Sequence, residues 1–397
     1  KRIFARRRSF GRRSAFHFSL FDLPFCPLLY AICPVRETRS IASLHRFDPS
    51  SLALPLYDFA ACWILAVLGP SALCSMLYAL CFFYLSPPYL FIMKRLPWTG
   101  VYPAVTTKFT EAGALDLDAF LFGIRAQLDA GVDGIIIGGS LGESSTITHD
   151  ERIEMLQATL QTFGHKVPVL INIAEGSTHN AIALAQKAEA AGADGLMVLP
   201  PMMYKSTEEE VVSFYADIAS STGLPILVYN NPVDYKVEVT VSMFEQLLRY
   251  DTIQAVKEST RDLSNVTRLI NAFGDRLMIL TGVDTIAAEA LIMGAHGWVA
   301  GLVNAFPAET VAIYKLIKAG RIDEALRIHR WFLPILELDI HPQLVQNIKL
   351  AEHMTELGNE YVRLPRKPLS GPERHRVMRI VEEGLANRPA LPVDLHE

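Results

Sequence analysis

The stretch Ala130-Gly131-Val132-Asp133-Gly134 returns 61 residues later as Ala191-Gly192-Ala193-Asp194-Gly195, and each copy precedes a short apolar run. Gly294-Ala295-His296-Gly297 is a looser third copy. A glycine that ends a helix lets the chain turn sharply into the next strand, because it tolerates the left-handed backbone conformation. The copies therefore indicate a repeated unit in which a helix leads into a strand.

Short β-rich runs alternate with amphipathic runs on both sides of these copies, which predicts strand–helix units around a parallel sheet. The predicted strands are 101–107, 134–140, 167–174, 195–200, 225–231, 253–259, 278–284 and 297–304. The predicted helices between and after them are 117–130, 150–163, 180–191, 208–220, 243–249, 263–273, 286–294 and 307–319. Eight such units favour an α/β fold of the (β/α)₈ TIM barrel type over an open doubly wound sheet.

We expect the barrel to occupy residues 93–319 and a helical extension to occupy residues 320–397. Three further amphipathic stretches, at 322–336, 344–357 and 372–386, form this extension. Such helices pack beside a barrel or between subunits, and the sequence leaves both possibilities open.

Residues 1–92 differ in composition from the rest of the chain. They carry 10 Lys/Arg against 4 Asp/Glu and all five cysteines, and no charged residue occurs from Phe59 through Met93. We expect this part to lie outside the enzyme, as a translated leader before a start at Met93. The alternative is a targeting segment or a membrane anchor, since the uncharged run exceeds the 20 or so residues that cross a bilayer.

Charge and motifs exclude several function classes for residues 93–397. This part has a net charge of −11 and no basic block, which argues against a nucleic-acid partner. It holds no cysteine, and its nine histidines are dispersed. No H-E-x-x-H, P-loop or G-x-G-x-x-G pattern is present, so we expect neither a metal nor a nucleotide cofactor.

Lys257 is the most unusual residue at a predicted strand end, in Ile253-Gln254-Ala255-Val256-Lys257-Glu258-Ser259. Side chains alternate along a strand, so Ile253, Ala255 and Lys257 share one face. If this face points into the barrel, burial lowers the pKa of the lysine and makes it a nucleophile toward a ketone. A surface lysine paired with Glu258 is the alternative.

Two other strand ends carry candidate groups. The phenol of Tyr229, in Val228-Tyr229-Asn230-Asn231-Pro232, suits proton transfer, unless it is a core tyrosine. The small residues of Gly138-Gly139-Ser140-Leu141-Gly142-Glu143 free backbone N–H groups to face an anion such as a carboxylate, unless they form only a tight turn.

The second of these runs also fits the G-x-S-x-G pattern of a serine hydrolase, with Ser140 as nucleophile and Asp284 and His341 as partners. This is the weaker hypothesis, because a nucleophile elbow opens directly into a helix. Here residues 143–148 intervene before the predicted helix cap.

Together, these motifs resemble those of the dihydrodipicolinate synthase/N-acetylneuraminate lyase family of class I aldolases, over residues 96–390. The matching runs are Gly139-Ser140-Leu141-Gly142-Glu143, Tyr229-Asn230-Asn231-Pro232, Val256-Lys257-Glu258 and Gly282-Val283-Asp284. The interval of 28 residues from Tyr229 to Lys257 also matches.

The resemblance implies a lyase in which Lys257 forms a covalent imine with a small 2-oxo acid, with no other cofactor. Tyr229 would relay protons, and Ser140 with nearby backbone amides would hold the substrate carboxylate. The substrate-binding residues it implies are Gly139, Ser140, Leu141, Asp234, Gly282, Asp284 and Val299, with Tyr204 and Asn231 as possible auxiliary residues. It also implies a cytoplasmic homotetramer, with organelle targeting or membrane attachment only if residues 1–92 belong to the working protein.

Departures from the family pattern indicate the type of reaction. Leu141 replaces a second hydroxyl, and Met203 stands where a tyrosine from the neighbouring subunit completes the proton relay. Asp234 replaces the arginine with which the synthases bind aspartate semialdehyde. The run from Tyr229 to Tyr235 is instead similar to that of 2-keto-3-deoxy-arabonate dehydratases and 1-pyrroline-4-hydroxy-2-carboxylate deaminases, which yield 2-oxoglutarate semialdehyde. We therefore expect loss of water or ammonia, with a 4-hydroxy-tetrahydrodipicolinate synthase or another pyruvate-dependent aldolase as the alternative.

Overall fold

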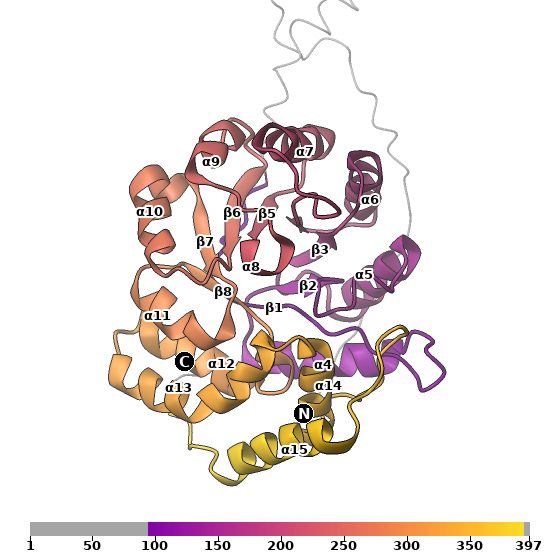
Figure 1. The fold of residues 1–397 in the computed structure, drawn as a ribbon, viewed down its shortest axis with the longest axis vertical. Helices are drawn as coiled ribbons and strands as arrows, with labels where there is room; N and C mark the ends of the chain where they lie inside the picture. The colour runs from indigo at the N-terminus through magenta and orange to yellow at the C-terminus, as the bar shows by residue number, and fades with distance from the viewer. Residues whose placement is uncertain (1–93, 393–397) are drawn as a thin grey trace, which may run out of the picture. The chain divides into compact units, whose positions relative to one another are not determined.

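Eight parallel strands form a barrel at the centre of the computed structural model, which describes residues 94–392 (Figure 1). The predictions for residues 1–92 lie outside the described residues. The strands are β1 (Gly100–Pro103), β2 (Ile135–Ile137), β3 (Val169–Ile173), β4 (Gly195–Val198), β5 (Ile226–Asn230), β6 (Ile253–Glu258), β7 (Met278–Thr281) and β8 (Gly297–Ala300). From β2 to β8, each strand pairs in parallel with the strand that follows it in the sequence.

The two ends of this sheet meet at β1. Strand β1 pairs in parallel with β8, and a parallel bridge from Ala104 to Ile136 joins it to β2. The amide of Val105 donates to the carbonyl of Ile136 across this joint, at 3.0 Å. The predicted (β/α)₈ TIM barrel is confirmed.

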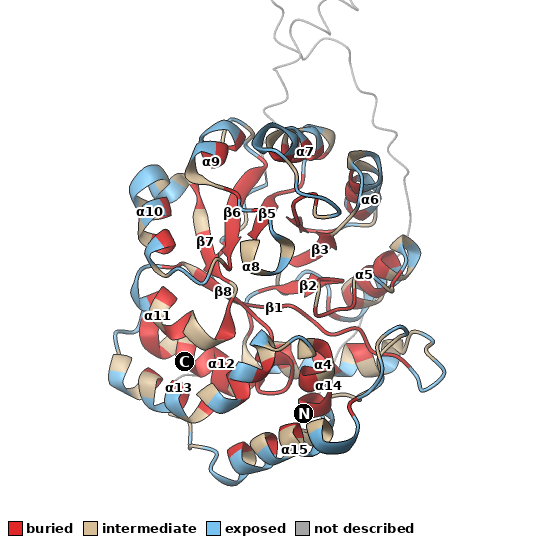
Figure 2. Cartoon of the chain, in the orientation of Figure 1, coloured by how far each residue is buried: buried red, intermediate tan, exposed pale blue. Residues whose placement is uncertain are grey.

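Helices follow the strands and surround the barrel. They are α4 (Leu117–Ala130), α5 (His149–Phe163), α6 (Thr178–Ala190), α7 (Glu208–Ser221), α8 (Pro232–Tyr235), α9 (Val241–Leu247), α10 (Ser264–Phe273), α11 (Ala287–Ile292) and α12 (Pro307–Lys318). Their outer faces are exposed, whereas the strands are almost wholly buried (Figure 2). Burial on both faces is usual for parallel strands, which explains why the strand runs are continuously apolar.

The repeated Ala-Gly-x-Asp-Gly pattern has a structural reason beyond its glycines. Gly131 and Gly192 adopt positive φ values of 89° and 92° as α4 and α6 end. The carboxylate of Asp194 then accepts from the amide of Val169, at the start of β3, at 2.9 Å. Asp133 accepts in the same way from the amide of Val101 in β1, also at 2.9 Å.

His296 makes the same bond in the looser third copy, where its Nδ1 accepts from the amide of Ile279 in β7 at 2.9 Å. We call Asp133, Asp194 and His296 the latch residues. The backbone N–H of each latch residue also donates to the strand, for example from His296 to the Ile279 carbonyl at 2.7 Å. They fix three strands at the amino end of the barrel.

Several strands end earlier than predicted at their carboxyl ends. The predicted strand 134–140 ends at Ile137, because Gly138 adopts a positive φ of 72°. The predicted strand 297–304 ends at Ala300 and passes into a 3₁₀ turn, η4 (Leu302–Asn304). The amides of Gly301 and Leu302 bind the carboxylate of Asp284 instead of a neighbouring strand. The chain therefore leaves the sheet where the barrel opens.

The predicted helical extension is present as α13 (Ile322–Leu336), a 3₁₀ turn η5 (Glu337–Ile340), α14 (Leu344–Met354) and α15 (Gly371–Ala386). Helix α13 packs on α12 and α15, and η5 packs on η3 (Asp284–Ile286), the 3₁₀ turn after β7. The extension thus lies against the barrel and reaches its carboxyl end. No helix among residues 94–392 is long and apolar enough to cross a membrane.

Candidate active site

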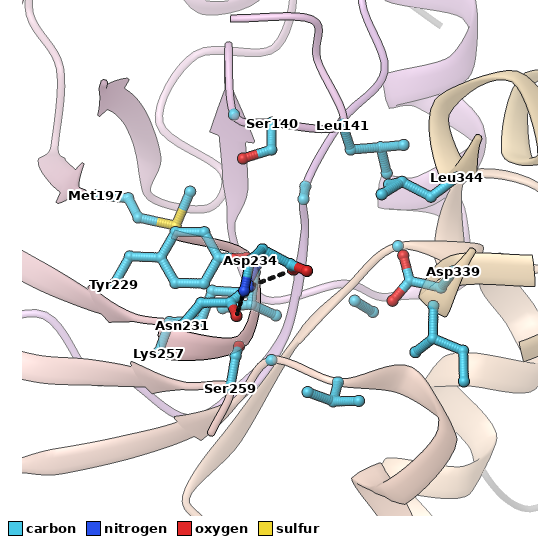
Figure 3. A pocket seen from close by; sticks show the side chains of 18 of the residues that line it. Ser140, Leu141, Met197, Tyr229, Asn231, Asp234, Lys257, Ser259, Asp339 and Leu344 are labelled. Atoms are coloured by element: carbon cyan, nitrogen blue, oxygen red, sulfur yellow. Dashed lines mark hydrogen bonds between the residues drawn. The ribbon is translucent and has the colours of Figure 1, made fainter. Parts of the chain in front are cut away.

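A pocket of about 680 Å³, which includes its open mouth, lies at the carboxyl ends of the strands. Figure 3 shows side chains from strand ends and from the C-terminal extension converging on it. The residues that line it are Ala104, Gly139, Ser140, Leu141, Met197, Tyr229, Asn231, Asp234, Tyr235, Lys257, Ser259, Arg261, Gly282, Val283, Val299, Ala300, Gly301, Asp339, Ile340 and Leu344. Active sites of TIM barrels occupy this end.

Lys257 lies at the inner face of β6 rather than at the surface, and only 7% of its surface is exposed. Its Nζ lies 4.0 Å from the centre of the Tyr229 ring. Burial lowers the pKa of Lys257, and the negative charge of Asp339 opposes this shift. A lysine in this setting is more often neutral than one in water, and a neutral amine is the form that attacks a ketone.

Gly282 leaves the space that Lys257 fills. A Cβ at position 282 would lie 2.5 Å from Cε of Lys257 and 2.3 Å from Oγ of Ser259. Both distances are too short for real contacts, so any larger residue would displace the lysine. Gly282 lines the pocket as predicted, and its contact with Lys257 gives it a positioning role in addition to the predicted contact with substrate.

Tyr229, Asn231 and Asp234 form a hydrogen-bonded group on the wall of the pocket beside Lys257 (Figure 3). The amide nitrogen of Asn231 donates to the Tyr229 hydroxyl at 3.3 Å and to Asp234 Oδ2 at 2.8 Å. Asn231 also caps α8, since its Oδ1 accepts from the amide of Asp234 at 3.1 Å. Burial raises the pKa of Tyr229, so its phenol keeps its proton until a partner takes it.

Tyr235 is a site residue that the sequence analysis missed. Its hydroxyl shares a hydrogen bond with Oγ of Ser140, and its ring meets that of Tyr229 edge to face with centres 5.7 Å apart. Burial raises the pKa of Tyr235 as well. The sequence signal was present, because Tyr235 ends the run from Tyr229 that is similar to that of the dehydratases and deaminases. Its contact with Ser140, however, joins residues 95 positions apart.

The C-terminal extension supplies a second group of missed residues: Asp339 and Ile340 from η5, and Leu344 from the start of α14. Figure 3 shows Asp339 across the pocket from Tyr229 and Lys257. Burial raises the pKa of Asp339 to about 8, with a further rise from the charge of Asp284. Nothing in the barrel repeat pointed to these residues, because they follow the last strand–helix unit.

The remaining predicted site residues divide into two groups. Gly139, Leu141 and Val299 line the pocket. Asp284 and Tyr204 are absent from the described lining of this pocket. Asp284 is buried behind it, and Tyr204 is 56% exposed beside two shallower hollows.

The carboxylate of Asp284 is engaged by the protein itself. It accepts from Nε1 of Trp298 at 2.9 Å and from the amide of Leu302 at 2.7 Å. A carboxylate with these partners holds the end of β8 and the turn after it in place. The structure thus gives Asp284 a positioning role at the pocket floor.

The arrangement gives no support to the serine hydrolase hypothesis. The hydroxyl of Ser140 is hydrogen-bonded to the hydroxyl of Tyr235, and the carboxylate of Asp284 accepts a hydrogen bond from the amide of Leu302, just after β8. The contacts described for His341 run to the amide of Gln343 and to Glu373. The three residues therefore do not form a relay. Within residues 94–392, no group of three or more His, Cys, Asp or Glu is placed to hold a metal ion.

Comparison with known proteins then identifies the relatives of this barrel. The model of the dihydrodipicolinate synthetase family matches residues 97–384. The chain belongs to this family. As a member of the dihydrodipicolinate synthetase family, it is a lyase of the class I aldolase type.

Individual relatives agree with this assignment. A 4-hydroxy-tetrahydrodipicolinate synthase from Geobacter sulfurreducens is 30% identical over 284 residues, which are 72% of this chain and 98% of the relative. A protein of the same name from Methanococcus aeolicus is 32% identical over 271 residues, or 67% of this chain and 92% of the relative. The crystal structure of a putative dihydrodipicolinate synthetase from Pseudomonas aeruginosa, 29% identical, superposes with a TM-score of 0.69 over 72% of this chain and 99% of that one.

Proposed function

We propose that this protein is a lyase that forms an imine between Lys257 and a small 2-oxo acid. The observation that carries the proposal is the position of Lys257, which is 93% buried at the pocket end of β6 with its Nζ over the ring of Tyr229. Burial lowers the pKa of Lys257, so a larger share of the reactive neutral amine is present than for a lysine in water.

Imine formation requires several proton transfers, and the hydroxyls near Lys257 can carry them out. The neutral amine of Lys257 adds to the ketone carbon, and the resulting carbinolamine oxygen takes a proton from Tyr229. The Tyr229 phenolate takes a proton back from the nitrogen and then gives it to the carbinolamine hydroxyl, which leaves as water while the nitrogen lone pair forms the C=N bond of the protonated imine. Ser140 and Tyr235 share a hydrogen bond, and the ring of Tyr235 packs edge to face on that of Tyr229, so this pair supports the return of these protons. The Tyr229, Ser140 and Tyr235 relay belongs to one chain.

Two reactions of the imine remain as candidates. The first is the condensation carried out by a 4-hydroxy-tetrahydrodipicolinate synthase, which was the alternative in the sequence analysis. The names of the relatives, at 27–32% identity, favour it over the main prediction.

The second is elimination of water or ammonia from a short substrate, to give 2-oxoglutarate semialdehyde. It is supported by Asp234, which lines the pocket where the synthase pattern has an arginine. A second carboxylate in the substrate would meet Asp234 on one wall of the pocket and Asp339 on the other. Arg261, which lies exposed at the pocket, is the remaining cation among the described lining residues besides Lys257.

A direct assay separates the two reactions. The full chain is incubated with pyruvate plus aspartate semialdehyde, with 2-keto-3-deoxy-arabonate, or with 1-pyrroline-4-hydroxy-2-carboxylate, and the products are identified by mass spectrometry. Formation of 2-oxoglutarate semialdehyde from either of the last two substrates supports elimination. A condensation product from the first pair supports the synthase. The variant Asp234→Arg sharpens the test, since elimination predicts that it loses activity and the synthase hypothesis predicts that it gains activity. No product from any of these mixtures would contradict both candidates.

A further inference from the structure

The C-terminal extension places a carboxylate inside the pocket. Asp339 lies on η5, between α13 and α14, and none of the eight strand–helix units contributes it. Its carboxylate stands over Gly301 at the end of β8, since a Cβ at Gly301 would lie 2.6 Å from Oδ1 of Asp339. Figure 3 shows it facing the side of the pocket that carries Tyr229 and Lys257. A substrate held on Lys257 would therefore lie between the two walls.

The structure holds the backbone that carries this carboxylate in place. The residue before it, Leu338, is 1% exposed, and its carbonyl accepts from Nδ2 of the buried Asn347 at 3.2 Å. Helix α14 is in turn tied to the barrel by Lys349, whose Nζ donates to Oε1 of Glu143 at 2.7 Å, with both side chains fully buried. A side chain that is positioned in this way at a pocket wall has the fixed geometry that proton transfer requires.

We propose that Asp339 is a catalytic acid–base residue that moves a proton between the carbon next to the imine and the oxygen or nitrogen one carbon further on. The proposal rests on imine formation at Lys257, as set out above. It divides the proton transfers between the two pocket walls: Tyr229 serves the carbinolamine, and Asp339 serves the carbon chain of the substrate.

The step balances for both candidate reactions. The Asp339 carboxylate takes a proton from the carbon beside the imine carbon, and the C–H electron pair forms the enamine C=C bond as the C=N pair returns to nitrogen. In elimination, the enamine pair then forms a new C=C bond, the bond to the leaving oxygen or nitrogen breaks, and that atom takes the proton from Asp339. In condensation, the enamine pair bonds to an aldehyde carbon, and the aldehyde oxygen takes the same proton. Asp339 ends as a carboxylate, and the imine is regenerated.

The charges around Asp339 suit this role. The charged and titratable groups that face it are Lys257 on β6, Asp284 on η3, Asp234 on α8 and Tyr229 on β5. Burial and the two neighbouring carboxylates raise its pKa to about 8, whereas Lys257 opposes the rise. A carboxylate with a raised pKa is a stronger base, and its acid form is still present near neutral pH. Both directions of transfer are then accessible.

The test compares Asp339→Asn with the wild type in two measurements. Reduction with borohydride in the presence of pyruvate reports the imine, and turnover of the active substrate reports the complete reaction. We expect Asp339→Asn to form the imine as the wild type does, which also shows that it is folded. Its kcat should fall by about 100-fold or more, the usual range for loss of an acid–base group, with little change in KM.

The pH profile supplies a readout that a structural role would not change. With Lys257 saturated as the imine, wild-type kcat should rise with pH up to about 8, because the first transfer needs the Asp339 carboxylate. This limb should be lost in Asp339→Asn. The matched control is Glu337→Gln, which removes an acid from the exposed face of the same turn and should leave both the rate and the profile unchanged.

Other results would overturn the proposal. If Asp339→Asn keeps kcat within about threefold of the wild type, or raises only KM, Asp339 does not transfer the proton. An unchanged pH limb in this variant would overturn it as well. If the wild type itself forms no imine, the proposed function fails first, and the role of Asp339 fails with it.

Discussion

The two ends of the barrel use polar side chains for different purposes. At the amino end, Asp133, Asp194 and His296 make one repeated bond, from a side chain to the amide that begins a neighbouring strand. At the carboxyl end, Lys257, Tyr229, Ser140, Tyr235 and Asp339 each occur once and face one pocket. The difference teaches that the polar residues repeated from unit to unit stabilise the barrel, whereas the polar residues without a repeat, at the pocket, are candidates for catalysis. Barrel enzymes in general separate stability and catalysis in this way.

The largest expected effect follows from removing the lysine. Lys257→Met keeps the length and the apolar stem of the side chain but removes the amine, so no imine can form. We expect turnover to fall by about 10⁴-fold or more, as when a nucleophile is lost from an enzyme. Product assays against time measure this loss, and thermal unfolding should show a melting temperature at or above that of the wild type. Turnover within tenfold of the wild type would show that Lys257 is not the nucleophile.

The second prediction concerns the buried pair that ties the extension to the carboxyl end. Lys349→Met removes the nearer cation of the fully buried Glu143 carboxylate and leaves Arg366 at 3.8 Å; loss of one partner of a buried pair costs about 3–5 kcal/mol of stability. Urea unfolding measures this change. The double variant Lys349→Met/Glu143→Gln should lose clearly less, because no unpaired charge remains. Equal losses in the single and double variants would argue against a buried ion pair.

Tyr235→Phe tests whether the relay is complete within one chain. The change removes only the hydroxyl that shares a hydrogen bond with Ser140. We expect kcat to fall by about 10–100-fold, with the edge-to-face packing on Tyr229 and the melting temperature maintained. The matched control is Tyr204→Phe, at an exposed position outside the pocket, which should leave kcat unchanged. The reverse pattern would place the second phenol at Tyr204.

The smallest effect on catalysis is expected at the amino end. Asp194→Ala removes the acceptor for the buried amide of Val169, which costs about 1–3 kcal/mol. Urea unfolding should show this loss, while kcat stays near that of the wild type, because Asp194 is far from the strand ends that form the pocket. A drop in kcat without a loss of stability would break the division between the two ends.

The pH dependence of imine formation tests whether Lys257, at the pocket end of the barrel, lies in an environment that lowers its pKa. The pKa of Lys257 is lowered from its usual 10.5, chiefly by burial. Below that pKa the lysine is charged and unreactive, so the rate of imine formation should rise with pH and level off below pH 10.5. Stopped-flow measurement with pyruvate tests the direction. A rate that still rises through pH 10.5 would indicate a lysine in a water-like environment.

The sequence predicted the barrel and the extension because both depend on local patterns. Alternating apolar runs and helix-ending glycines fix the order of the elements, and the predicted helix 117–130 coincides with α4. The alternation of Ile253, Ala255 and Lys257 also put the lysine on one face with two apolar residues, and the structure shows that this face points inward. Strand ends were predicted less well, because the chain leaves the sheet through bonds such as those of Leu302 and Asp284 that no local pattern shows.

The parts of the site that could not be predicted depend on contacts between distant segments. Tyr235 meets Ser140 across 95 residues, and Asp339 reaches the pocket only because α13 and α14 fold back on the barrel. Asp284 was expected to bind substrate, but the structure engages its carboxylate with three groups at the end of β8. The latch role of His296 was also hidden, since the sequence showed only its glycines as the repeated feature.

The most direct test of the central claim is borohydride reduction of the full chain with pyruvate, followed by intact-mass measurement and peptide mapping. We predict one reduced adduct per chain, on Lys257, and no adduct on Lys257→Met. Lys349 is buried and is not among the described residues that line the pocket, so it serves as an internal control and should stay unmodified. An adduct on another lysine, or no adduct in the wild type with any 2-oxo acid, would contradict the account.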